Sequence, residues 1–130
     1  MKRTVVLLLA SFLLVTCSKS SSTNTTNQTD CAATLAGTYS GVDFCSGSGQ
    51  IPYPANITAT TLNNIIISNL YGVTVNGTVD CQHSTITIPA QTSGNFSISG
   101  AGSYTATRIN INWTAYNYGV PINCSTIYTR

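Results

Sequence analysis

Apolar and polar residues alternate without a break in the stretch Ile109-Asn110-Ile111-Asn112-Trp113-Thr114-Ala115. In an extended chain, successive side chains point to opposite faces, so the four apolar residues share one face and the polar residues share the other. This period of two predicts a half-buried β-strand. We expect Trp113 to lie in the core and Tyr116, which continues the polar face, to meet solvent.

The same period recurs earlier in the chain. Val73, Val75 and Val79 alternate with polar residues in the range 73–80, and Ile86 and Ile88 alternate with Thr85 and Thr87. Further strand candidates, rich in the Thr, Ile, Tyr and Phe that strands favour, are Leu35 to Phe44, Asn56 to Thr61, Asn64 to Ser68, Asn95 to Ser99 and Ser125 to Thr129.

Short turn signals separate these segments. They are Ser46-Gly47-Ser48-Gly49, Leu62-Asn63-Asn64, Tyr71-Gly72, Thr92-Ser93-Gly94, Gly100-Ala101-Gly102 and Asn117-Tyr118-Gly119. Connections this short favour antiparallel neighbours, and no stretch combines a helical period with helix-forming residues. We therefore expect an all-β antiparallel meander of about eight strands, forming either a small barrel or a sandwich.

The amino-terminal residues have the layout of a secretory signal. Lys2 and Arg3 precede an apolar segment from Thr4 to Val15, which is shorter than the roughly 20 apolar residues that a transmembrane helix needs. Residues 14–17, Leu-Val-Thr-Cys, resemble the relaxed lipobox of bacteroidete-type lipoproteins. This resemblance implies that residues 1–16 are a lipoprotein signal peptide and that Cys17 is lipidated, which gives a stable membrane anchor because several acyl chains insert.

The next segment is expected to be a tether. Residues 18–30 contain Ser, Thr, Asn, Gln, one Lys and one Asp, with no apolar residue to bury. Residues 17–30 would then join the lipid to an all-β domain at 31–130, over at most about 45 Å. Ser18 follows Cys17, without the Asp that would suggest inner-membrane retention. We expect a lipid-anchored protein of the cell envelope, in the outer membrane.

Charge excludes one class of partner. The charged side chains beyond the signal peptide sum to zero; they are Lys19, Arg108 and Arg130 against Asp30, Asp43 and Asp80. A nucleic-acid-binding protein needs a basic patch to replace the counterions on phosphates. We therefore expect no nucleic-acid partner.

Four cysteines remain once Cys17 is assigned to lipid: Cys31, Cys45, Cys81 and Cys124. An even number of cysteines in an exported chain predicts two disulfides, and three pairings are possible. A zinc site is the alternative. No two of these cysteines have CxxC spacing and the only histidine is His83, so we expect no metal.

Three motifs resemble the calycin-like, lipocalin-like domains of small bacteroidete lipoproteins. They are Leu35-Ala36-Gly37-Thr38-Tyr39, Ile86-Thr87-Ile88-Pro89-Ala90-Gln91, and Ile98-Ser99-Gly100-Ala101-Gly102-Ser103-Tyr104 leading into Ile109-Asn110-Ile111. The resemblance covers nearly all of residues 31–130. It implies a calycin-like fold in which Cys45–Cys124 joins the first strand to the last, and this leaves Cys31 to pair with Cys81. Most members of the family have no known activity, so it implies little about function.

Catalytic signatures are absent from the sequence. No phosphate loop, nucleotide fingerprint, HExxH or GxSxG motif occurs. Asp80 and His83 are the one close acid–base pair, and we expect Asp80-Cys81-Gln82-His83 to form an ordinary turn between two strands. We expect neither enzymatic activity nor a cofactor.

Tyrosines are the better candidates for binding. Tyr53, Tyr71, Tyr116 and Tyr118 lie near expected loops or on the solvent face, where an aromatic ring can stack on a sugar or an apolar ligand. The alternative is that these residues only cover strand surfaces, because Tyr has a high β propensity.

Two functions are compatible with these features. The first, which we favour because a domain of this size can hardly enclose a large pocket, is a structural or protein-interaction module of the envelope. The second is a calycin-like binding module for a small apolar molecule or a glycan. Strand number does not separate them, because a barrel of about eight strands holds either its own side chains or one small ligand.

Overall fold

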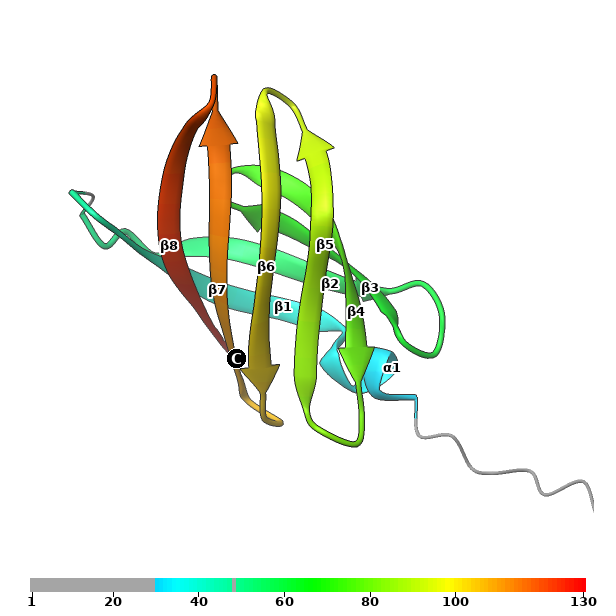
Figure 1. Ribbon diagram of the computed structural model, residues 1–130. Coiled ribbons are helices and arrows are strands. Elements are labelled where there is room, and N and C mark those ends of the chain that lie inside the picture. Colours follow the sequence, from blue (N-terminus) through cyan, green and yellow to red (C-terminus); the bar gives the residue numbers. More distant parts are fainter. Residues whose placement is uncertain (1–29, 48) are drawn as a thin grey trace, which may run out of the picture.

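The computed structural model describes residues 30–47 and 49–130, which form one closed antiparallel barrel (Figure 1). A short helix, α1 (Cys31–Leu35), precedes the strands. The strands are β1 (Gly37–Cys45), β2 (Tyr53–Ala59), β3 (Asn64–Leu70), β4 (Val73–Asp80), β5 (Thr85–Ser93), β6 (Phe96–Tyr104), β7 (Arg108–Asn117) and β8 (Val120–Thr129). The expected signal peptide, Cys17 and tether lie outside the described residues.

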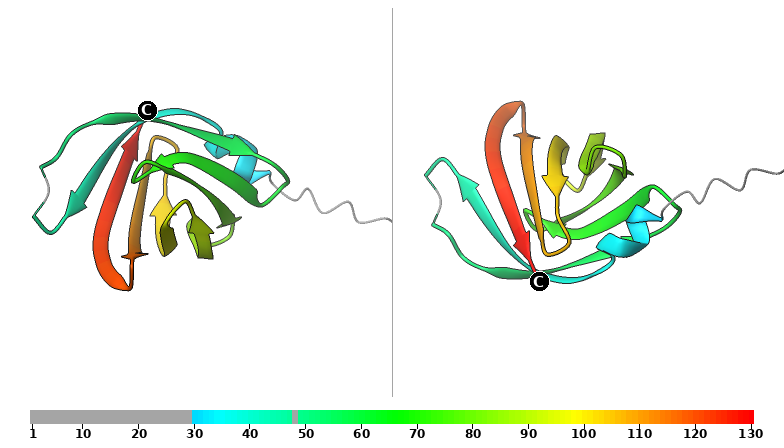
Figure 2. Two further views of the ribbon diagram at one scale, coloured as in Figure 1. Left: turned by 90° about the horizontal axis from the view of Figure 1, so that it is seen from above. Right: turned by 90° about the horizontal axis from the view of Figure 1, so that it is seen from below.

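The expected all-β meander is confirmed, and it closes into a barrel. Each strand pairs with the next in sequence, and β1 closes the ring by pairing with β8 from Ser40↔Thr129 to Cys45↔Cys124. Figure 1 shows β5 to β8 crossing in front of β1 to β3, and the two views of Figure 2 look at this arrangement from above and from below. Among the described residues, no helix has the length and apolar character needed to cross a membrane.

The core lies inside the barrel and follows the alternation of each strand. Ile109, Ile111, Trp113 and Ala115 are all buried, as the period of two predicts. Apolar side chains from the other strands and from α1 meet them there. The outward positions are mainly Ser, Thr and Asn, so the surface is wetted by uncharged polar groups.

The helix α1 corrects one prediction. Leu35 was expected to begin the first strand, but it ends a helical turn instead. The Oδ1 atom of Asp30 accepts a hydrogen bond from the Ala33 amide at 2.9 Å, which caps the helix. Five residues are too few to show a helical period, and their place is fixed by the disulfide Cys31–Cys81 and by burial of Ala32 and Leu35.

A second correction concerns Gly100-Ala101-Gly102, which was expected to be a turn. The strand β6 runs straight through it and pairs with β7 from end to end. A Cβ atom on Gly102 would overlap the carbonyl oxygen of Asn110, and one on Gly100 would lie 2.7 Å from the carbonyl oxygen of Asn112. These glycines therefore allow the backbones of β6 and β7 to approach closely. In a sequence, glycines with this role cannot be told from glycines of a turn.

The two ends of the barrel differ. The end that we call the α1 end carries α1, the carboxyl terminus and the connections at 60–63, 81–84 and 105–107. The opposite end, which we call the open end, carries the connections at 46–52, 71–72, 94–95 and 118–119. The disulfide Cys31–Cys81 ties α1 to the first end, and Cys45–Cys124 ties β1 to β8 at the second. This is the pairing that the family resemblance implied.

Candidate functional site

Side chains inside the barrel become partly exposed towards the open end. Ile57, Ile67 and Ile111, near the middle, are buried. Five inward-facing residues near the open end are half-buried, although Leu70 there is buried; the five are Cys45, Tyr53, Val73, Phe96 and Ile122. Solvent therefore reaches some of the inward-facing side chains at this end, as it does Ala59 and Tyr104 at the other.

A carboxylate lies in this partly exposed region. Asp43 occupies the inward phase of β1, after Tyr39 and Gly41. Its Oδ1 atom accepts hydrogen bonds from the Tyr53 hydroxyl at 2.6 Å and from the Thr126 hydroxyl at 2.5 Å. The same Thr126 oxygen accepts the indole N–H of Trp113 at 2.7 Å. Four side chains from β1, β2, β7 and β8 thus form one polar chain inside an otherwise apolar barrel.

Two tyrosines fill the space beside this carboxylate. Burial, and next the hydrogen bond to Asp43, raise the pKa of Tyr53. Burial also raises the pKa of Tyr128, so both remain neutral donors at physiological pH. A Cβ atom on Gly41 would lie 2.7 Å from Cε2 of Tyr53 and 2.8 Å from Cε1 of Tyr128. The two rings therefore occupy the space that glycine leaves free.

Tyr71 covers part of the interior. Its ring centroid lies 5.0 Å from that of Trp113 and 5.7 Å from that of Phe96. The residue sits in the β3–β4 turn with a φ of 53°, and Gly72 follows with a φ of 77°. Tyr71 is thus held inward by aromatic packing.

Exposed apolar side chains gather around the open end. Six large ones are exposed in the described part of the chain, and Leu62 alone lies at the α1 end. The other five, which we call the rim, are Phe44, Ile51, Tyr116, Tyr118 and Val120. The rim therefore places most of the exposed large apolar side chains of the described residues at one end of the barrel.

The tip of the rim has an unfavourable backbone conformation. Tyr118 has a φ of 50° and Gly119 a φ of 81°, which is the positive pair that a type I′ hairpin turn needs and that Asn-Gly supplies best. A bulky residue in this left-handed region costs about 1 kcal/mol. Tyr118 is nevertheless 90% exposed, so packing within the described residues does not compensate for the strain.

The four predicted binding tyrosines all lie towards the open end but form no single site. Tyr53 and Tyr71 point inward, whereas Tyr116 and Tyr118 belong to the exposed rim. Reasoning from sequence missed Asp43. Its alternation with Tyr39 and Gly41 was the available signal, because it places a carboxylate on the core face.

The pair Asp80 and His83 forms the expected turn at the α1 end. His83 Nδ1 lies 2.6 Å from Asp80 Oδ2, and both side chains are well exposed. The hydrogen bond from His83 lowers the pKa of Asp80. No group of three or more His, Cys, Asp or Glu that could hold a metal occurs within residues 30–47 and 49–130.

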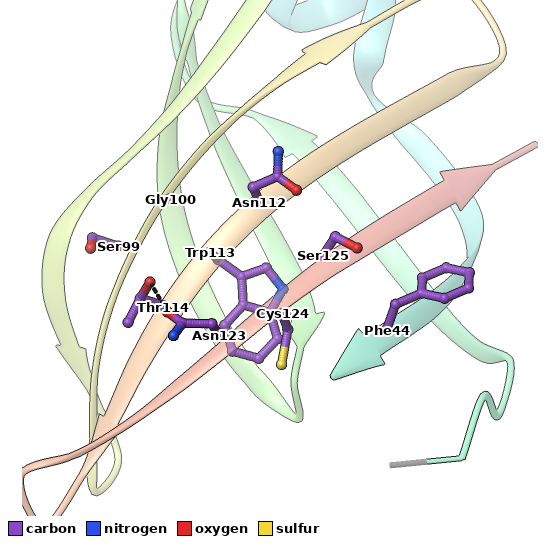
Figure 3. Close-up of a pocket in the computed structure, with 9 residues that line it drawn as sticks. All are labelled: Phe44, Ser99, Gly100, Asn112, Trp113, Thr114, Asn123, Cys124 and Ser125. Carbon is purple, nitrogen blue, oxygen red and sulfur yellow. Dashed lines mark hydrogen bonds between the residues drawn. The ribbon is translucent and has the colours of Figure 1, made fainter. Parts of the chain in front are cut away.

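A concave feature lies on the outer face of β6, β7 and β8. This hollow of about 550 Å³ is lined by Phe44, Ser99, Gly100, Asn112, Trp113, Thr114, Asn123, Cys124 and Ser125 (Figure 3). The Thr114 hydroxyl donates to Asn123 Oδ1 at 2.7 Å. None of the lining residues carries a charge, so the hollow offers amides and hydroxyls, with Phe44 at one side.

Comparison with known proteins identifies the fold. A redesigned β-barrel, b11L5F_LGL, has a TM-score of 0.58 at 13% identity, over 76% of this chain and 93% of that one. The redesigned barrel mFAP1, bound to DFHBI, has a TM-score of 0.58 at 18% identity, over 76% and 97%. A proposed outer membrane protein of Bacteroides fragilis has a TM-score of 0.50 at 16% identity, over 77% of this chain and 52% of that one.

These similarities define the class of the protein as a closed eight-stranded antiparallel β-barrel. The chain spans about half the length of the Bacteroides fragilis protein. No protein-family model and no curated protein matches the sequence.

The polar chain inside the barrel should contribute to stability through Thr126. Thr126→Val removes a fully buried hydroxyl, leaves the Trp113 indole N–H without its acceptor and removes one donor from Asp43. We expect the free energy of unfolding in urea to fall by about 1–3 kcal/mol. The matched control is Thr87→Val on the exposed face of β5. An equal loss of unfolding free energy in the two variants would contradict a stabilising role for the hydrogen bonds of Thr126.

Proposed function

We propose that this protein is a lipid-anchored envelope protein of the calycin-like type, which binds a protein partner at the open end of its barrel and catalyses no reaction. The observation that carries this proposal is the rim, because five of the six exposed large apolar side chains lie at one end. The exposed pair Asp80 and His83 lies in a turn at the other end. Within the described residues, this pair is not part of a group of three or more His, Cys, Asp or Glu that could hold a metal ion.

The point at which the expected tether would join the barrel is compatible with binding at the open end. Asp30, the first described residue, lies beside α1 at the α1 end. Cys17 precedes it by thirteen residues. An anchor at Cys17 would therefore be joined to the barrel at the α1 end and would leave the open end free of the tether. The fold similarity to a proposed outer membrane protein is compatible with this location.

The chemistry of the rim favours a protein partner. Aromatic residues are enriched at protein interfaces, and Tyr116 and Tyr118 present large apolar areas at the tip of one hairpin. Strain in the backbone at Tyr118 has no structural compensation within the described residues, and strain of this kind is often retained at functional positions. A partner that packs on the Tyr118 ring would provide the missing contact.

Intact mass spectrometry of the protein recovered from its native membrane tests the anchor. We expect a mature chain that begins at Cys17, carries acyl groups and gains about four hydrogens on reduction of two disulfides. An unmodified amino terminus at another residue would remove the anchor from the proposal.

Tyr118→Asn tests the open end as the binding end, because it should stabilise the fold and yet weaken partner binding. Asn tolerates the left-handed conformation, so we expect the free energy of unfolding to rise by about 1 kcal/mol. We expect partner binding to be lost, because the exposed ring is gone. The measurement is photo-crosslinking in envelope membranes. A photoreactive residue replaces Ile51, which also belongs to the rim. Chains with and without the Tyr118→Asn substitution are compared.

The control places the same photoreactive residue at Leu62, at the α1 end. A specific partner should give an adduct of discrete mass from position 51 that excess unlabelled wild-type barrel competes away and the Tyr118→Asn barrel does not. Equal adducts from positions 51 and 62, or equal competition by both barrels, would contradict binding at the rim.

A glycan is the second candidate ligand, and the outer hollow favours it. Its amides and hydroxyls can both donate and accept hydrogen bonds, which suits a neutral polyhydroxy ligand, and Phe44 provides an apolar surface at its side. We expect neutral oligosaccharides to shift the side-chain amide resonances of Asn112 and Asn123 in NMR spectra, and Asn112→Ala to weaken that binding. Unchanged resonances at millimolar oligosaccharide would exclude this function.

A further inference from the structure

Asp43 has no counter-ion within the described residues. The two arginines of this part of the chain, Arg108 and Arg130, both lie at the α1 end. Arg130 donates hydrogen bonds to the carbonyl oxygens of Thr34 at 2.9 Å and Ala36 at 3.3 Å, and Arg108 donates to the Asn110 side chain at 3.1 Å. A carboxylate inside a barrel is costly when no opposite charge accompanies it.

The two oxygens of this carboxylate differ in their partners. Both described hydrogen bonds, from Tyr53 and Thr126, end on Oδ1. No hydrogen bond from a described residue reaches Oδ2, and Asp43 is only half-buried. One oxygen is thus held by two protein hydroxyls, and the other accepts no hydrogen bond from a described residue.

Three aromatic residues contact Asp43 or are linked to it. Tyr53 contacts it directly, and Trp113 is joined to it through Thr126. Tyr71 packs on Trp113 nearer to the open end. The faces of aromatic rings attract cations, and their edges and faces also pack against alkyl chains. The surroundings therefore suit a positively charged group on an apolar stem.

We propose that Asp43 binds a cationic nitrogen, an ammonium or guanidinium group, which enters the barrel from the open end. The group is carried either by a free amine or by a Lys or Arg side chain of a partner. This inference rests on the proposed function in taking the open end as the binding end. A metal ion is not favoured, because one carboxylate and two hydroxyls are too few ligands.

The single tryptophan of the chain makes the proposal directly testable. Its indole N–H gives one resolved NMR resonance, and Thr126 links it to the carboxylate. We would titrate the purified barrel with hexylamine and with hexanol, which have the same length but differ in charge. We expect hexylamine to shift the indole resonance with saturation, at a dissociation constant about tenfold or more below that of hexanol.

Two variants separate the charge from the hydrogen bonds. Asp43→Asn keeps an Oδ1 acceptor for both hydroxyls, so we expect it to fold and to bind amine and alcohol equally. Tyr53→Phe removes one donor but keeps the carboxylate, so the preference for the amine should persist. A preference that survives in Asp43→Asn, or that disappears in Tyr53→Phe while Asp43 is intact, would overturn the assignment. Urea unfolding checks that each variant is folded.

The source of the cation is distinguished by two further ligands. A short peptide with one Lys and the same peptide with norleucine are added in separate titrations. A lysine-specific shift stronger than that of hexylamine indicates a protein partner, whereas a weaker shift indicates a free amine. If hexanol and hexylamine bind equally to the wild-type barrel, the open end binds ligands but charge recognition is wrong. If neither ligand shifts the resonance, the interior site itself is wrong, and crosslinking at the rim remains an independent test of the proposed function.

Discussion

The pairing of β1 with β8 is the constraint on which the rest of the structure depends. An antiparallel meander without this pairing would leave two long edges, each with unpaired backbone groups that invite aggregation. Closure removes both edges, and Cys45–Cys124 fixes it covalently between two directly paired residues. The same register pairs Asp43 with Thr126, residues separated by 83 positions in the chain. The polar chain inside the barrel is therefore a direct consequence of how the barrel closes.

How much the sequence predicts depends on whether a signal is local. Alternation is local, so the strand from 109 to 115 and the core position of Trp113 could be predicted from neighbouring residues alone. Closure is not local: the alternation in β1 places Asp43 on the core face, but nothing in that strand indicates that Thr126 of β8 is its partner. Glycine is ambiguous for a related reason: in Gly100-Ala101-Gly102 it permits a close approach between β6 and β7, which depends on residues of another strand. The helix α1 is hidden because it is too short to have a period.

The two ends of the barrel differ in their cross-links and in their exposed apolar side chains. At the α1 end, Arg130 lies 5.2 Å from the centroid of the Tyr39 ring and donates to the carbonyl oxygens of Thr34, Ala36 and Ala106. Together with Cys31–Cys81, these bonds join α1, the β6–β7 connection and the carboxyl terminus. Left-handed backbone conformations occur at both ends, at Tyr71 and Tyr118 of the open end and at Ser84 of the α1 end. The ends differ instead in exposed apolar area, because five of the six exposed large apolar side chains of the described residues lie at the open end.

The chemical identity of residue 43 is the remaining question that the fold alone does not answer. The hydroxyls of Tyr53 and Thr126 need an acceptor at this position, and the carbonyl oxygen of an asparagine would serve both without a charge. An apolar residue would suit the surrounding barrel better still if the hydroxyls were absent. Hydrogen bonding therefore explains a polar side chain at this position, but it does not explain a carboxylate. What the carboxylate adds is negative charge at an oxygen that no described residue contacts through a hydrogen bond, on a side chain that is only half-buried. Attraction of a cation is the one physical consequence of that charge that neither the fold nor the internal hydrogen bonds already use.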